Sequence, residues 1–180
     1  YGVSYLLSLP LFIFSLFLFF VTIKDFFGKN INISQKISHF GFSLLILSIL
    51  LNGVLAKEHS SNMKVGDEIK FLNKIIKFQN IEVIKKQNYQ SLIGEFNIVD
   101  EKNSLSLKPE IRIYDQPQTI TSEADISSTI FADNFLVFNI IKNDGFYNVR
   151  YQIKPFMIWI WISVLLISLG GILSLKKKNV

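Results

Sequence analysis

Residues 37–56 read ISHFGFSLLILSILLNGVLA, and this stretch decides the fold. These twenty residues carry one ionisable side chain, His39, which lies near the start of the run. A helix of about 20 apolar residues is long enough to cross the hydrocarbon core of a bilayer. Ionisable side chains inside such helices are rare, and most of them serve a function. The stretch therefore predicts a membrane-spanning helix, and His39 is the first candidate for a functional residue.

Two further apolar blocks indicate two more spans. The first block is uncharged from residue 3 to residue 23 and contains Pro10, which membrane helices tolerate better than soluble ones. The last block opens with Pro155, a favourable residue in a first helical turn, and stops at three lysines. Tyr1 is not followed by the basic region of a signal peptide, so we expect the C-terminal part of a longer protein, or one piece of a split protein. The expected transmembrane helices are 1–23, 37–56 and 155–175.

The placement of charge predicts the orientation. The segment 57–154 holds thirteen basic and thirteen acidic residues, so the net charge of +5 lies in the loop 24–36 and the tail 176–180. An excess of Lys in short flanking segments marks the cytoplasmic or matrix side. We therefore expect the loop and the tail inside and the segment 57–154 outside. This means the periplasm for a bacterial inner membrane, or the intermembrane space for a mitochondrial one. Because no basic patch lies on the large segment, nucleic acid is excluded as a partner.

The extracytoplasmic segment 57–154 has the pattern of an all-β domain. Residues 135–141 and 146–153 are two apolar runs joined by a turn with Asp144-Gly145, which is a hairpin signature. In the second run, alternate residues from Tyr147 to Ile153 share one face. A change of alternation at Gln79-Asn80 suggests a β-bulge. The further expected strands are 68–72, 75–78, 81–84, 92–98 and 110–114, which together favour a small barrel or sandwich.

Catalytic motifs are sparse in this domain. The chain has no Cys, which excludes disulfides and thiol chemistry. His59 lies beside Glu58 without a second metal ligand nearby, so a solvated linker residue is the favoured interpretation over a metal site. Glu123 and Asp125 are expected on one face of a strand, where a solvated face is favoured over a catalytic pair. No hydrolytic motif is present, and we expect no hydrolytic chemistry.

His39 is best considered on a helical wheel. At about 100° per residue the face of His39 also carries Ser43, Ile46, Leu50 and Gly53, whereas Ser48 and Asn52 lie on roughly the opposite side. This face is mostly apolar and small, so a flat apolar macrocycle could lie against it. Two interpretations stay open at this point. His39 either binds an iron through a neutral imidazole or forms a hydrogen bond to a neighbouring helix or a headgroup.

An ordered set of short motifs extends over nearly all of the chain beyond residue 37. The motifs are His39–Phe42, Met63–Asp67, Asn88–Tyr89, Leu107–Tyr114, Glu123–Ile126, Tyr151–Phe156, Trp159–Trp161 and Gly170–Gly171. In this order they resemble the C-terminal end of the CcmF family, the haem lyase subunit of cytochrome c maturation. Each motif is short, and it is the ordered set that makes the resemblance specific.

The resemblance implies a fold and a role. Members of this family are large polytopic membrane proteins that receive haem from a haem chaperone and help to attach it to apocytochrome c. It implies that His39 is an axial ligand of a membrane-embedded haem b, through the haem iron, with a second His outside this chain. The Trp-rich haem-handling segment and the other family histidines have no match here, so this fragment alone is not expected to be active.

The same resemblance assigns the β domain a docking role beside the site of haem transfer. Glu110, Arg112 and Tyr114 are then contact or framework residues, with framework favoured because an alternating strand with a Glu–Arg pair is more often scaffold. Other membrane subunits of the maturation system and the lipid bilayer are the remaining expected partners. The alternative is a membrane-anchored partner-binding or sensor module whose helices are anchors without a role in haem binding.

Overall fold

The protein is described here from a computed structural model, which covers residues 2–28, 31–100, 103–141 and 145–177. The chain divides into two compact units. The helical unit comprises residues 1–56, 128–133 and 154–180, and the β unit comprises residues 57–127 and 134–153. Each unit is described separately below.

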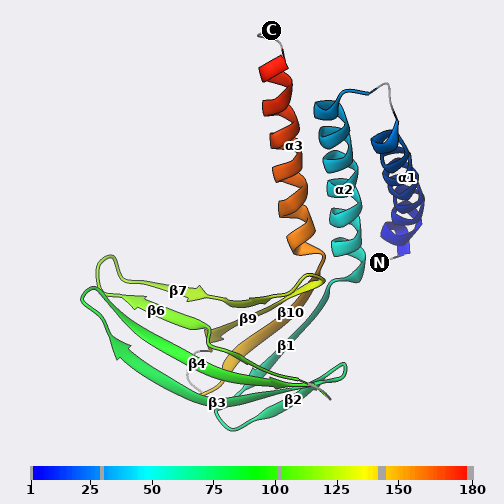
Figure 1. Cartoon of the computed structure of the whole chain (residues 1–180). Coiled ribbons are helices and arrows are strands. Elements are labelled where there is room, and N and C mark those ends of the chain that lie inside the picture. Colours follow the sequence, from blue (N-terminus) through cyan, green and yellow to red (C-terminus); the bar gives the residue numbers. More distant parts are fainter. Residues whose placement is uncertain (1, 29–30, 101–102, 142–144, 178–180) are drawn as a thin grey trace. The chain divides into compact units, whose positions relative to one another are not determined.

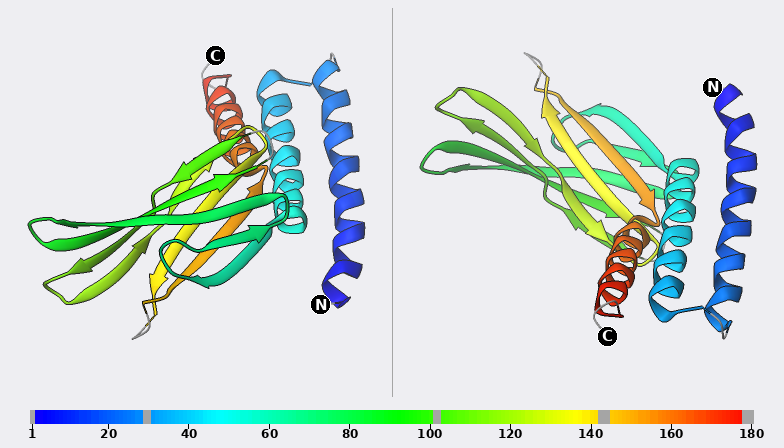
Figure 2. Two further views of the ribbon diagram at one scale, coloured as in Figure 1. Left: turned by 90° about the horizontal axis from the view of Figure 1, so that it is seen from below. Right: turned by 90° about the horizontal axis from the view of Figure 1, so that it is seen from above.

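Three long helices make up most of the helical unit (Figure 1). Their bounds are α1 Gly2–Phe27, α2 Ile33–Leu55 and α3 Met157–Lys177. Each contains a stretch that is long and apolar enough to cross a membrane, which confirms the three predicted spans. The further views agree that α2 lies between α1 and α3 (Figure 2).

The helices extend beyond the apolar runs from which they were predicted. The expected loop 24–36 is shorter, because α1 continues to Phe27 and α2 begins at Ile33. Lys36, now in the first turn of α2, donates hydrogen bonds from Nζ to the carbonyl oxygens of Phe26 (2.9 Å) and Gly28 (2.5 Å). A helix C-terminus leaves several carbonyls without partners, and a lysine ammonium group satisfies them well. Hydropathy marks only the apolar part of such helices.

Small residues bring α2 and α3 together. A Cβ atom added at Gly41 would lie 3.0 Å from the backbone nitrogen of Ile167. A Cβ added at Gly170 would overlap the hydroxyl of Ser38 and would lie 2.8 Å from the carbonyl oxygen of Ser34. Close approach of backbones at small residues is the usual way in which membrane helices pack, because lipid offers no hydrophobic gain on association.

The contact between α1 and α2 combines one polar pair with aromatic packing. The hydroxyls of Thr22 and Ser43 are 2.7 Å apart and buried. Beside them, the ring of Phe40 lies 5.7 Å from that of Phe19 and 6.0 Å from that of Phe26. Each hydroxyl also lies within hydrogen-bond distance of a carbonyl in its own helix. Because each carries one proton, one hydroxyl donates to the other across the helices while the second donates to its own carbonyl.

The β unit consists of two antiparallel sheets. One has the strand order β1-β10-β9-β8 and the other β2-β3-β4-β6-β7, with β5 paired to β4. The bounds are β1 Lys57–Met63, β2 Glu68–Phe71, β3 Lys74–Lys85, β4 Tyr89–Val99, β5 Ser104–Leu107, β6 Glu110–Tyr114, β7 Thr119–Glu123, β8 Asp125–Ser128, β9 Ala132–Ile140 and β10 Tyr147–Pro155. Both sheets contribute to a single buried cluster, as in a β-sandwich.

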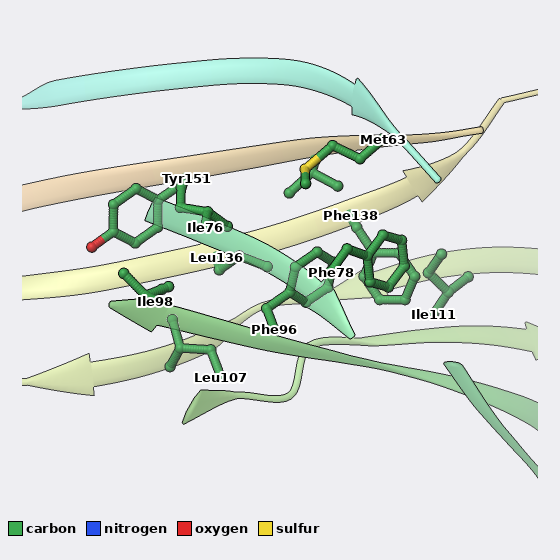
Figure 3. Packing of buried hydrophobic residues seen from close by; sticks show 11 residues of the cluster. Met63, Ile76, Phe78, Phe96, Ile98, Leu107, Ile111, Leu136, Phe138 and Tyr151 are labelled. Atoms are coloured by element: carbon green, nitrogen blue, oxygen red, sulfur yellow. The ribbon is translucent and has the colours of Figure 1, made fainter. Parts of the chain in front are cut away.

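Aromatic rings from both sheets meet in this core (Figure 3). The rings of Phe78 and Phe96 stack 4.2 Å apart, and Phe138 from the facing sheet meets Phe96 edge-on at 5.7 Å. Gly94 makes room for them, because a Cβ there would lie 2.7 Å from the ring of Phe96 and 3.0 Å from that of Phe138. The sandwich is therefore closed by large rings that pack over a bare backbone position.

Several predicted features of the β unit are confirmed. The register of β3 against β4 shifts between Phe78 and Asn80, at the predicted bulge. β9 and β10 are hydrogen-bonded neighbours, as the hairpin prediction requires. Gly145 has a φ of +66°, while residues 142–144 of that turn lie outside the described residues. Val149 and Tyr151 are buried in the core, on the predicted face of the last strand.

Candidate functional site

His39 lies on α2, six residues after its first residue, Ile33. At 1.5 Å rise per residue this is about 9 Å from the start of the helix. Its side chain is exposed, and no hydrogen-bond partner for its imidazole is found within the part of the chain that the structure describes. The imidazole is therefore available to a ligand or to a group outside this chain.

The surface around His39 is apolar and open. Phe42 and Ile49 are 54% and 51% exposed, and Gly53 is exposed as well. Together with the half-buried Ile46 they continue the stripe of His39 along α2, because residues three or four apart share a helix face. Neither α1 nor α3 covers this stripe, which we call the His39 face.

One residue assigned to this face by the wheel does not belong to it. Ser43 is fully buried and bonds to Thr22, so it points toward α1. Leu50 is half-buried. A wheel orders residues by angle, but it does not tell which sector a neighbouring helix occupies, and α1 occupies the sector of Ser43. The His39 face is thus more apolar than the sequence predicted.

The side of α2 that the wheel placed opposite His39, with Ser48 and Asn52, packs on α3. Ser48 is buried. Asn52 donates from Nδ2 to the carbonyl oxygen of Pro155 at 2.6 Å and approaches the Sδ atom of Met157 at 3.9 Å. The end of α2 is thereby attached to the start of α3. The sequence shows Asn52 as a polar residue in a span, but not its partner, which is 103 residues away.

An apolar cavity of about 290 Å³ lies on the α1 side of the helices. It is lined by Ile23, Phe26, Phe27 and Phe40. His39 is not among these residues, since it points to another side of α2 than its neighbour Phe40. The residues that line the cavity offer no polar group to orient a ligand. The cavity is therefore not a second candidate ligand-binding site beside that of His39.

His59, the other histidine, lies in the β unit. It belongs to strand β1 and is half-buried, which corrects the interpretation of a solvated linker residue. Its ring stacks on Phe71 at 5.3 Å with an interplanar angle of 22°. Across the described ranges, no group of three or more potential ligand side chains could hold a metal ion. The packing gives His59 a structural role in the sandwich.

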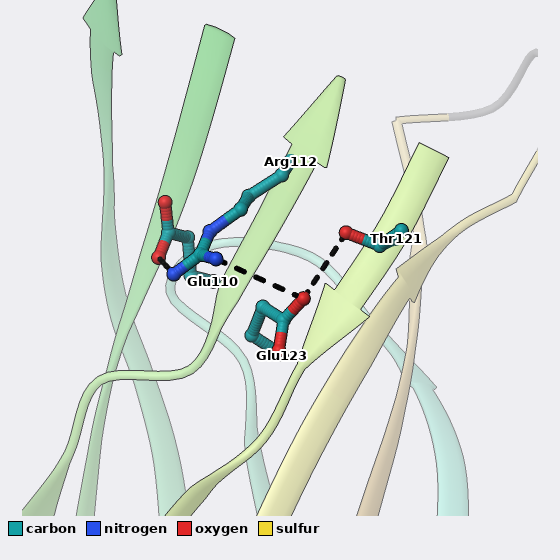
Figure 4. A network of polar contacts seen from close by, with 4 residues as sticks. All are labelled: Glu110, Arg112, Thr121 and Glu123. Carbon is teal, nitrogen blue, oxygen red and sulfur yellow. Dashed lines mark hydrogen bonds and ion pairs between the residues drawn. The ribbon is translucent and has the colours of Figure 1, made fainter. Parts of the chain in front are cut away.

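The polar cluster around Arg112 joins strands of the larger sheet (Figure 4). Arg112 Nη2 lies 2.9 Å from Glu110 Oε2, and Nη1 lies 4.0 Å from Glu123 Oε1. Thr121 Oγ1 donates to the same Glu123 oxygen at 3.2 Å. On the other side, the guanidinium of Arg112 lies 5.4 Å from the centre of the Tyr89 ring. The cluster thus connects β4, β6 and β7.

The electrostatics of the cluster are those of a framework. The hydrogen bond from Arg112 lowers the pKa of the Glu110 carboxyl below its ordinary value of 4.5, despite partial burial. The same bond raises the pKa of Arg112, which stays charged. The ring of Tyr114 contacts that of Tyr89 in a tilted arrangement, with ring centres 5.2 Å apart and an interplanar angle of 42°. Each of the three residues named from the sequence therefore has a partner within the sheet.

The two carboxylates Glu123 and Asp125 do not share a strand, which corrects their placement on one strand face. Glu123 ends β7 of the larger sheet, and Asp125 begins β8 of the smaller one. Asp125 accepts hydrogen bonds from the backbone nitrogens of Lys108 (2.6 Å) and Ile126 (2.9 Å). Asp125 therefore caps backbone donors at the crossing between the sheets, and the two carboxylates do not form a pair.

These features define a class: a membrane segment of three apolar helices into which a β-sandwich is inserted between the second and third helix. The model of the CcmF C-terminal β-sandwich matches residues 54–155. The chain belongs to the CcmF family.

The relatives that this chain matches are several times longer than the chain. It is 30% identical to a cytochrome c-type biogenesis protein of Rhodobacter capsulatus and 26% identical to CcmF of Pseudomonas aeruginosa, in both cases over 81% of this chain and 22% of the relative. CcmF of Escherichia coli is 27% identical over 77% of this chain. The chain thus spans about a fifth of the length of these relatives. A solved structure, the cytochrome c haem lyase CcmF, shares the fold with a TM-score of 0.65 at 14% identity, covering 92% of this chain and 29% of that one.

Proposed function

We propose that this chain is the C-terminal part of a membrane haem lyase of cytochrome c biogenesis, in which His39 supplies one axial ligand to a membrane-embedded b-type haem. The observation that carries the proposal is the exposed imidazole of His39, which has no partner among the described residues and lies on the open face of α2. The family membership supports the general role, because the relatives are cytochrome c-type biogenesis proteins.

The residues of the His39 face fit such a group. Haem iron accepts the ring nitrogen of a neutral imidazole, and its macrocycle is flat and largely apolar. Phe42, Ile46 and Ile49 offer apolar surface on the same face. Gly53, near the C-terminal end of α2, adds no side chain to this face. A second axial ligand would come from outside this chain, because His59 is packed on Phe71 in the β unit.

Within the mechanism, the chain's own residues position the imidazole. A b-type haem bound there would act as an electron relay, passing electrons from an external donor to the iron of incoming haem. Ser38 and Gly41, on either side of His39 in the sequence, pack against α3 and fix the rotation of α2. Thr22 and Ser43 fix the same helix against α1. Because α2 is packed against a helix on each side, the imidazole of His39 keeps a defined direction. A metal site requires such a fixed ligand.

We assign the β-sandwich a docking role outside the membrane, in the periplasm or the intermembrane space, next to the site where haem reaches apocytochrome c. In this assignment the Arg112 cluster is framework that holds the shape of the larger sheet. Its charges are mostly paired with one another, which leaves little to attract a partner. The haem chaperone and apocytochrome c are the proposed partners of the whole protein.

The test uses the complete assembly and the two histidines of this chain. His39→Ala should abolish or strongly reduce the b-type Soret band and lower the yield of c-type cytochromes. His59→Ala is the matched control, since it removes the same side chain from a packed position and should leave the Soret band intact. An unaltered band and a normal cytochrome yield in His39→Ala would refute the ligand assignment and leave a membrane-anchored binding module as the better description.

The orientation needs a separate test. A phosphatase reporter fused after Asn103, in the connection between β4 and β5, should be active, because the enzyme folds only outside the cytoplasm. The same reporter fused after Lys177 should be inactive. Activity of the second fusion alone would reverse the orientation deduced from the lysines.

A further inference from the structure

We propose that the turn between β8 and β9, residues 128–133, is a membrane anchor whose tip, Ile130 and Phe131, enters the headgroup–acyl boundary of the outer leaflet. In the sequence, β9 and β10 separate the turn from α3, yet the turn belongs to the helical unit. Its tip exposes two large apolar side chains, with Ile130 61% and Phe131 69% exposed. This proposal does not depend on the role of His39.

The turn is closed by its own hydrogen bonds. Thr129 Oγ1 donates to the carbonyl oxygen of Ala132 at 2.7 Å and accepts from the Ala132 nitrogen at 3.1 Å. The backbone nitrogen of Thr129 also donates to the Ala132 carbonyl at 3.0 Å. These bonds leave Ile130 and Phe131 at the tip. The apolar tip is therefore a shaped element and can be presented to one surface.

Two further hydrogen bonds attach the tip to the start of α3, one from its first turn and one from Phe156, the residue before it. The indole Nε1 of Trp159 donates to the carbonyl oxygen of Ile130 at 2.9 Å. The backbone nitrogen of Phe156 donates to the carbonyl oxygen of Phe131 at 2.8 Å. The tip is thus held at the level where the third span begins, at Met157.

These bonds also lower the cost of entering lipid. An unsatisfied peptide carbonyl costs several kcal/mol in the hydrocarbon region, which normally keeps irregular backbone out of it. The carbonyls of both tip residues already accept hydrogen bonds, one from Trp159 of α3 and one from Phe156 just before it. When the tip leaves water, burial of its two apolar side chains therefore lowers the free energy. The two carbonyls keep their hydrogen bonds.

The neighbourhood matches the boundary of a bilayer. Trp161, two residues after Trp159, is 63% exposed, and tryptophan side chains concentrate at the membrane interface. Leu165, further along α3, is 63% exposed and belongs to the span. The tip therefore extends the exposed apolar surface of a helix that can span a membrane, and we commit to lipid as its occupant.

The charge pattern specifies the lipid. Residues 126–132 contain no charged side chain, and the nearest charges in the sequence are the acidic Asp125 and Asp133. Interfacial segments that select anionic lipid carry Lys or Arg on the polar side. The turn should therefore enter a neutral phosphatidylcholine bilayer, with serine and threonine hydroxyls near the headgroups.

A spin label measures the depth. The chain has no Cys, so Phe131→Cys gives a single site here once any cysteines elsewhere in the complete protein are replaced. The protein is placed in phosphatidylcholine nanodiscs, and collision of the label with oxygen is compared with collision with a water-soluble nickel chelate. We expect preference for oxygen and a depth of roughly 5–10 Å below the phosphates.

Three outcomes are informative. Ile120→Cys on β7, where the native side chain is 61% exposed, gives the reference for a β-unit position, and Trp161→Cys gives the reference for a span. A label at Phe131 that resembles the one at Trp161 supports the anchor. A label that collides with nickel as at Ile120 overturns it, and so does protection from both reagents, which would mean that protein covers the tip. Ile130→Cys repeats the measurement if Phe131→Cys does not fold.

Discussion

Gly170 of α3 lies against Ser38 of α2 so closely that no side chain would fit between them. Ser38 immediately precedes His39, so this contact sets the position of the candidate ligand as well as the distance between two spans. The following residue, Gly171, has no atom within 4 Å of the place where its Cβ would lie. Two adjacent glycines thus offer a controlled experiment.

Gly170→Ala should destabilise the protein by about 1–3 kcal/mol, because an added methyl group in a packed contact forces the backbones apart. The measurement is thermal unfolding of the purified complete protein in detergent, followed by loss of the monodisperse size-exclusion peak. Gly171→Ala should leave the midpoint almost unchanged. Equal midpoints for the two variants would show that α3 does not contact α2 at Gly170.

The hydroxyl pair between α1 and α2 is suited to a double-mutant cycle. Thr22→Val and Ser43→Ala each remove one side of the 2.7 Å contact. Because hydrogen bonds between membrane helices couple by about 0.6 kcal/mol on average, and each hydroxyl keeps a carbonyl of its own helix, we expect a coupling of that size. Strictly additive effects in unfolding titrations would mean that the two hydroxyls do not interact.

Gly94→Ala should weaken the sandwich, because its Cβ would meet the rings of Phe96 and Phe138. We expect a loss of about 1–3 kcal/mol, seen as faster hydrogen exchange of amides in β4. Phe138→Leu in the same chain removes part of the obstructing ring. Its combination with Gly94→Ala should therefore cost less than the sum of the two single changes. A double variant with fully additive losses would contradict this packing.

The Glu110–Arg112 pair should make the larger sheet sensitive to acid. The pKa of Glu110 is lower in the folded state than its ordinary value of 4.5, so its contribution is present above that pH. It is lost as the pH falls through the lower folded value. Exchange protection of β6, corrected for intrinsic rates, should therefore fall below pH 4.5 in the native protein.

Glu110→Gln should remove part of this dependence. Glu123→Gln, whose carboxylate is 4.0 Å from the guanidinium rather than 2.9 Å, should change it less. A Glu110→Gln protein with the same acid dependence as the native one would assign the effect to other carboxyls.

The spans and the central strands were predictable because their signals are local. Apolar runs gave three helices, and alternation gave β2, β3, β4, β6, β9 and β10. The strand β5, which pairs with β4, was missed. The edge strand β1 was also missed, and the edge strands β7 and β8 were predicted as one strand around Glu123 and Asp125. Their sequences, KEHSSNM, TITSE and DISS, are mostly polar. An edge strand forms because its neighbour offers backbone partners, which its own side chains do not reveal.

The candidate site was predicted in part for a similar reason. His39 is conspicuous as the one ionisable side chain in residues 37–56. It can be recognised without knowing which residues pack around it. The assignment of Ser43 to its face was wrong, because the bond to Thr22 depends on where α1 packs. The bond from Asn52 to Pro155 and the bonds from α3 to the 128–133 turn join residues distant in sequence, and no periodicity marks them.

The bond from Asn52 to Pro155 has a consequence for the origin of the architecture. It joins Asn52, near the point where the chain first leaves the helical unit, to Pro155, just after the point where the chain last re-enters it. Within the β unit, the first and last strands are also neighbours, with Lys57 opposite Ile153. A module whose two ends meet can be exchanged or removed without disturbing its host. The second and third spans can thus be regarded as one helical hairpin, and the sandwich as a cassette inserted between them in the sequence.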